Sequence, residues 1–153
     1  RRAKAVDQAA KALKGGATMS RAKVGPMREI VPLLQVGDME TSLDYYQQVL
    51  DFAVDFVWPA EGEARWAGLS RDGVHFMITI DLGTSSLPFI AEKGNGVVFY
   101  VLTDAIESLY DDLTARGAII VQDLVELGGR RQFSVADPSG YVLAFSEPFE
   151  YLT

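Results

Sequence analysis

The stretch Val36-Gly37-Asp38-Met39-Glu40-Thr41-Ser42-Leu43 decides the fold, because its pattern occurs twice in the chain. Its Asp, Ser and Leu recur 66 residues later as Asp104, Ser108 and Leu109. A fixed period that repeats the same local roles indicates a duplicated supersecondary unit. We therefore expect two copies of one module.

The first copy has the expected order β-α-β-β-β. An apolar strand over 30–36 precedes Asp38, which is placed to cap a helix. The apolar positions of that helix follow helical spacing: Met39, Leu43, Tyr46 and Leu50. Strands are expected at 52–58, 64–69 and 74–80, and the Asp72-Gly73 pair favours a tight hairpin between the last two. Alternation in the first of these strands places four residues on one face: Phe52, Val54, Phe56 and Trp58.

The second copy repeats this order. A strand over 97–102 leads to a helix that we expect Asp104 to cap, with Glu107 completing a capping box and Gly117 ending the helix. Its apolar face consists of Ile106, Leu109, Tyr110 and Leu113. Three more strands are expected at 118–125, 131–135 and 141–146, and residues 81–95 connect the two copies.

Charge divides the chain of 153 residues into two parts. Residues 1–26 hold seven of the 14 basic residues and one of the 21 acidic residues. We interpret 1–26 as a basic helical arm and linker, with a helix over 1–14, or as a tag, and 27–153 as one domain. The acidic domain makes nucleic acid an unlikely partner for it, whereas the arm leaves open an interaction role.

Composition excludes several classes of chemistry. The sequence has no cysteine, so disulfides, thiolate metal sites and thiol nucleophiles are absent. No apolar run approaches the roughly 20 residues that a membrane helix needs. These features favour a cytoplasmic protein without a membrane partner.

From 29 to 147 the chain resembles the vicinal oxygen chelate superfamily of glyoxalases, extradiol dioxygenases and bleomycin-resistance proteins. The resemblance rests on the segments 36–46, 50–52, 113–117 and 133–145. One departure is Asp51, where the family usually has glycine. The resemblance implies an α+β fold in which two βαβββ modules, at about 29–81 and 95–147, form a shared half-barrel cleft with helices packed outside. It also implies a homodimer, and it leaves open whether modules pair within one chain or between chains.

The family's metal ligands have no counterparts in this sequence. Metal-using members place His or Gln on the first strand of each half and Glu on a last strand. The matching positions here are Val31, Gly96 or Val98, Met77 and Ala144. Since none of these can bind a divalent cation, we expect no metal, no cofactor and no catalytic residue.

One residual ligand set stays open, in which Gln35, His75 and Glu147 converge with another acidic residue. His75 is the single histidine of the chain.

Strand alternation predicts which residues face the cleft. Phe76, Ile78 and Ile80 suit the helix side, as do Leu143 and Phe145. The predicted ligand-binding residues combine apolar, aromatic and hydrogen-bonding groups: Leu33, Gln35, Trp58, Trp66, His75, Met77, Thr79, Val98, Tyr100, Phe133 and Ser146. The alternative interpretation is that the tryptophans serve the core or an interface and that His75 is a packing residue.

The sequence thus favours a metal-independent small-molecule-binding protein that resembles bleomycin-resistance proteins. It would sequester a cationic or aromatic antibiotic-like ligand without chemistry. The alternative is a glyoxalase-like lyase or isomerase that uses His75 or an unrecognised metal site.

Overall fold

The computed structural model describes residues 25–80, 94 and 96–150, so the expected helix over 1–14 and most of the connector lie outside the described residues. The chain forms two compact units, 1–30 and 31–153, and the second holds both modules. None of the helices in the described ranges combines the length and apolarity that crossing a membrane requires.

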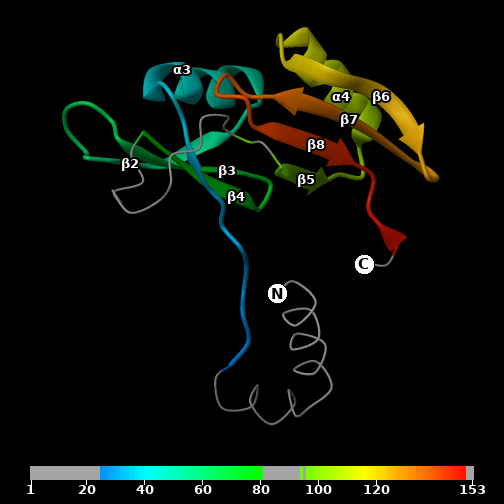
Figure 1. The fold of residues 1–153 in the computed structure, drawn as a ribbon, viewed down its shortest axis with the longest axis horizontal. Coiled ribbons are helices and arrows are strands. Elements are labelled where there is room, and N and C mark those ends of the chain that lie inside the picture. The colour runs from blue at the N-terminus through cyan, green and yellow to red at the C-terminus, as the bar shows by residue number, and fades with distance from the viewer. Residues whose placement is uncertain (1–24, 81–93, 95, 151–153) are drawn as a thin grey trace, which may run out of the picture. The chain divides into compact units, whose positions relative to one another are not determined.

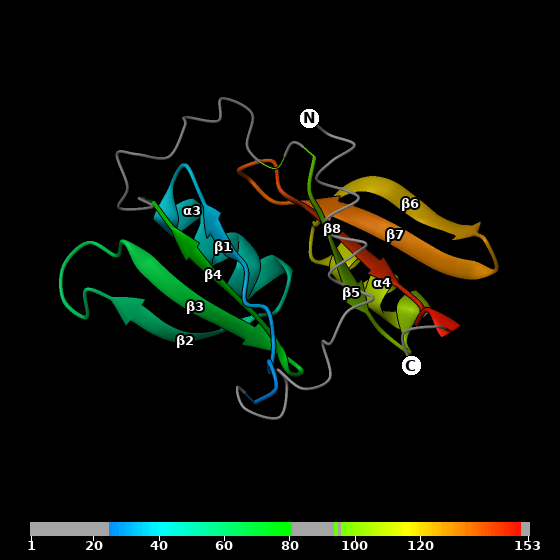
Figure 2. The same cartoon turned by 60° about the horizontal axis from the view of Figure 1, so that its bottom comes forward.

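Each module folds as β-α-β-β-β and makes its own four-stranded sheet (Figures 1 and 2). The first module contains β1 (Leu33–Gln35), α3 (Met39–Asp44), the π-helical turn η1 (Tyr45–Val49), β2 (Ala53–Trp58), β3 (Trp66–Arg71) and β4 (Val74–Thr79). The second contains β5 (Val98–Leu102), α4 (Ile106–Ala115), β6 (Ile119–Leu127), β7 (Arg130–Ala136) and β8 (Val142–Ser146). The order is β1-β4-β3-β2 in sheet A and β5-β8-β7-β6 in sheet B, and the matching orders confirm the predicted duplication.

Asp38 caps α3 as predicted, because its Oδ1 accepts a hydrogen bond from the Thr41 N–H at 2.7 Å. The helix then widens into η1, where the Leu50 N–H bonds to the Tyr45 carbonyl. Asp51 follows with a φ of 60°. That left-handed conformation is the one glycine adopts most readily, which explains why the family pattern places glycine there.

The predicted capping box at the start of α4 is wrong. Ala105 occupies the N-cap position without a side-chain cap, and the Thr103 Oγ1 accepts a hydrogen bond from the Ala105 N–H at 3.1 Å. Glu107 pairs with Arg131 on β7 instead, because a charged partner from another element is available to it.

The predicted alternation of β2 is also wrong beyond Val54. A bulge at Asp55 shifts the register, so that Val54 pairs with Leu69 whereas Phe56 pairs with Gly68. A bulge places one extra residue in a strand and turns every later side chain to the other face. Phe56 and Trp58 therefore lie on the opposite face of sheet A from Phe52 and Val54.

The helices cover one face of each sheet. Tyr46 of η1 makes edge-to-face contacts with Phe52 and with Phe76 of β4. On sheet B, Tyr110 of α4 makes the same kind of contact with Phe133, which stacks on its neighbour in β8. We call the faces opposite these helices the inner faces.

Three tyrosine hydroxyls join the two modules. Tyr46 donates to the buried Asp137 carboxylate at 2.9 Å, Tyr45 to the Ala136 carbonyl at 2.7 Å, and Tyr141 to the Gln35 carbonyl at 2.9 Å. Burial raises the pKa of Asp137, while the Tyr46 hydroxyl and backbone donors of the following turn act in the opposite direction. A buried carboxylate is tolerated only with such donors.

Replacing Tyr46 with Phe removes one of these donors and keeps the ring. We expect a loss of about 1–3 kcal/mol in the free energy of unfolding, measured by urea denaturation. Because the ordinary pKa of Asp is 3.8 and that of Asp137 is raised, its ionisation lowers stability as pH increases through the folded value. The Tyr46 hydroxyl lowers the pKa of Asp137 because it stabilises the charged carboxylate, so the loss in Y46F should be larger at pH 7 than at pH 3. The control Y110F, which removes an exposed bond to Asp123, should change stability by less than about 0.5 kcal/mol at either pH.

Candidate functional site

Register assigns the inner face of sheet A. Leu33 pairs with Met77, and Gln35 pairs with Thr79, so these four side chains share a face. Trp66 pairs with Thr79 and continues that face onto β3. The structure thus brings together most of the predicted sheet A residues, including the exposed His75 on β4.

Three aromatic side chains dominate this face. Trp58 and Trp66 are direct cross-strand partners, and Phe56 lies two pairs further along, against Gly68. Trp58 is 61% exposed, and the Trp66 Nε1–H points at the Met77 sulfur at 3.4 Å. With Val57 the three rings line an open hollow of about 600 Å³. We call Phe56, Trp58 and Trp66 the aromatic patch.

Sequence reasoning missed Phe56 as a site residue, because strict alternation placed it with the core. Gly68 was the available signal: a glycine inside a strand often marks a bulge or a close approach on its partner. A Cβ atom at Gly68 would overlap the Phe56 ring, so the glycine provides the space that this ring occupies.

The predicted hydroxyl groups are less accessible than expected. Thr79 is 2% exposed and donates through Oγ1 to the Arg65 carbonyl at 2.9 Å. Ser146 is fully buried and donates to the Glu147 carbonyl at 2.9 Å. Each hydroxyl proton is therefore engaged with the backbone.

The inner face of sheet B carries Val98 and Tyr100, each about half exposed, on β5. On the same face, beyond β8, lies a polar group that sequence reasoning missed: Gln122, Gln132 and Ser134. The Gln122 Oε1 accepts from the Gln132 Nε2 at 3.0 Å. Alternation along β7 could have found two of them, because Gln132 and Ser134 pair with the inner-face positions of β8.

Phe133 is not an inner-face residue, which corrects the prediction that it lines the cleft. It pairs with Phe145, is fully buried, and stacks on that ring at 5.1 Å between centroids. Both residues pack under α4 because this register places odd-numbered β7 residues on the helix side.

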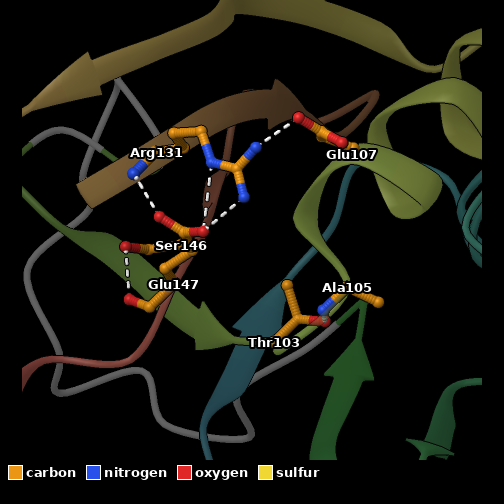
Figure 3. A network of polar contacts seen from close by, with 6 residues as sticks. All are labelled: Thr103, Ala105, Glu107, Arg131, Ser146 and Glu147. Atoms are coloured by element: carbon orange, nitrogen blue, oxygen red, sulfur yellow. Dashed lines mark hydrogen bonds and ion pairs between the residues drawn. The ribbon is translucent and has the colours of Figure 1, made fainter.

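The residual metal-ligand set of Gln35, His75 and Glu147 does not converge. Glu147 turns to the helix side, where it accepts two hydrogen bonds from the Arg131 guanidinium (Figure 3). These bonds hold the pKa of Glu147 below its usual value. Gln35 aligns with Thr79, four residues from His75 along β4, which separates them by roughly 13 Å.

The positions that bear ligands in metal-using members do not fit a cation. Val31, Met77 and Val98 present hydrocarbon or thioether groups, and Ala144 is buried. Within the described ranges, no three His, Asp or Glu side chains gather closely enough to hold a metal. In proteins, divalent transition metals bind to imidazole, carboxylate or thiolate ligands, and these positions offer none of them.

Paired βαβββ modules with helices on one face of each sheet define the vicinal oxygen chelate fold. The chain belongs to the Glyoxalase/Bleomycin resistance protein/Dioxygenase superfamily, whose family model matches residues 29–145. No curated protein matches the chain.

Solved structures agree on the fold. TioX from Micromonospora sp. ML1 is similar with a TM-score of 0.67 and 26% identity, over 80% of this chain and 100% of TioX. A glyoxalase/bleomycin resistance protein/dioxygenase from Nocardioides matches with a TM-score of 0.63 and 20% identity, over 87% of this chain and 92% of its own. A glyoxalase-related enzyme from Fulvimarina pelagi matches with a TM-score of 0.62 and 17% identity, over 80% of this chain and 89% of its own.

Replacing Gly68 with Ala should displace the Phe56 ring and disturb the aromatic patch. We expect destabilisation of about 1–3 kcal/mol, with a shift in tryptophan fluorescence emission, because overpacking forces neighbouring side chains to move. The control G37A adds a Cβ that meets nothing within 4 Å. Equal stability and equal emission in G68A and G37A would contradict this close packing.

Proposed function

We propose that the protein is a metal-independent small-molecule-binding protein whose inner faces hold a planar aromatic ligand without changing it chemically. The observation that supports the proposal is the aromatic patch, which is exposed on a face where the described residues gather no three His, Asp or Glu side chains. Stacking on an aromatic side chain adds about 0.5–1.5 kcal/mol beyond the burial of area, and it requires no reaction. The absence of cysteine from the sequence suits the reducing cytoplasm, where we propose that the protein works.

We further propose that a second copy of the chain completes the binding site. The hydroxyls of Tyr45, Tyr46 and Tyr141 bond across the two modules, and each inner face keeps exposed apolar side chains. Trp58 on sheet A is 61% exposed, and Val98 on sheet B is 50% exposed. Exposed apolar side chains that gather on one face of a sheet, as in the aromatic patch, are typical of an interaction site. In the proposed homodimer, sheet A of one protomer faces sheet B of its partner.

The proposed interface predicts a dimer that depends on β5. Light scattering should show a dimer for the unmodified chain and a monomer for Val98→Glu, since a charge buried in an interface without a partner is costly. The control Glu126→Gln changes an exposed residue of β6 and should remain a dimer. A dimeric V98E would contradict this arrangement.

Binding itself is tested with 2-naphthamide, an uncharged planar aromatic probe, by calorimetry. Trp66→Ala should weaken binding about tenfold or more, because it removes stacking and apolar contact together. His75→Gln should leave the dissociation constant within about twofold, because His75 serves neither stacking nor catalysis in this proposal. Chemical conversion of a ligand that H75Q abolished would instead support the lyase or isomerase alternative.

A further inference from the structure

Two neighbouring arginines of β7 point to opposite faces of sheet B. Arg131 is on the helix side, where Glu107 and Glu147 neutralise it. Arg130 is on the inner face, because alternation along β7 groups it with Gln132 and Ser134. The inner face therefore carries one guanidinium close to the polar group formed by those two residues.

Arg130 lacks a carboxylate partner. Arg71, Arg116 and Arg131 each form an ion pair with at least one acid, whereas no ion pair forms at Arg130 among the described residues. Its Nε atom is buried and makes no hydrogen bond. A buried donor without an acceptor is rare in native proteins and calls for an explanation, above all in a domain as acidic as this one.

The C-terminal segment holds the Arg130 side chain in place. The guanidinium carbon lies 3.9 Å from the centre of the Phe149 ring. Phe149 in turn contacts Tyr100 edge to face, with centroids 5.6 Å apart. An arginine stacked on an aromatic ring keeps its planar N–H edge free to bind an acceptor, and this stacking restricts its orientation.

We propose that Arg130 forms an anion-binding subsite on the inner face of sheet B and that the ligand carries a carboxylate, or an anion of similar shape, attached to its planar aromatic part. A carboxylate can accept two parallel hydrogen bonds from the guanidinium edge formed by the two terminal nitrogens, Nη1 and Nη2. This inference rests on the proposed function and narrows it: the ligand is an aromatic acid rather than a cation.

The test compares 2-naphthoate with its uncharged counterpart 2-naphthamide, using calorimetry on the full chain. We expect naphthoate to bind at least tenfold more tightly than naphthamide. Arg130→Gln should remove this preference by weakening naphthoate alone, and Arg130→Lys should recover it in part, since lysine keeps the charge but not the planar edge. The control Arg28→Gln removes an equal charge from an exposed position and should leave both affinities unchanged.

A second readout does not depend on the aromatic patch. In a proton–nitrogen NMR spectrum, the Nε–H signal of Arg130, assigned through R130K, should shift and saturate on titration with sodium acetate at constant ionic strength. If naphthamide fails to bind while acetate still saturates this signal, the proposed function fails and the anion subsite stands. If naphthoate and naphthamide bind equally and the signal does not move, the subsite is refuted and the aromatic site stands. A dimer that dissociates on R130Q, with the acetate signal unmoved, would assign Arg130 to the interface and overturn the inference.

Discussion

The buried hydrogen bond from Tyr46 to Asp137 is the contact on which the arrangement of the modules depends. Asp137 also accepts the backbone N–H groups of Ser139 and Tyr141, so one carboxylate organises the turn before β8 and binds the first module at once. The Tyr46 ring, fully buried against Phe52 and Phe76, fixes the other end of this bond in the core of sheet A. A partly satisfied polar contact in such a place would be costly, and this one has donors on several sides.

This junction determines which surfaces remain for function. The modules meet through η1 and the turn around Asp137, and exposed aromatic side chains remain on both inner faces, Trp58 on sheet A and Tyr100 on sheet B. The aromatic patch on sheet A and the Tyr100–Phe149–Arg130 contact on sheet B then become available to a ligand or to a second copy. The geometry supplies stacking surfaces and one cation, which are tools of recognition rather than of bond cleavage.

The features that the sequence predicted correctly are those that depend on local periodicity. Helix faces follow a 3.6-residue repeat, and Met39, Ile106 and Leu113 are buried as that repeat requires. The duplicated order of elements and the cap at Asp38 are likewise local signals. The faces of β4 and β8 followed from alternation, which holds wherever no bulge interrupts a strand.

What sequence reasoning missed depends on contacts between distant residues. The bulge at Asp55 places Phe56 on the opposite face from the predicted one. The Asp55 Oδ1 accepts a hydrogen bond from the Ser70 hydroxyl on the next strand. Glu107 does not form the predicted capping box, because it makes an ion pair with Arg131 of β7 instead. Arg131 is paired with acids on the helix side, whereas Arg130 lies on the inner face. The sequence alone could not predict this difference, because it does not show which of two adjacent arginines faces an acid.

We propose that the inner faces recognise a ligand without a metal, because they present aromatic and aliphatic groups where a cation requires imidazole and carboxylate. The most direct measurement is the binding of 2-naphthamide to chelator-treated protein before and after adding zinc or nickel, together with the midpoint of thermal unfolding. We expect the same dissociation constant and the same midpoint in both states. Binding that disappears with the chelator and returns with the metal, accompanied by a higher midpoint, would contradict it.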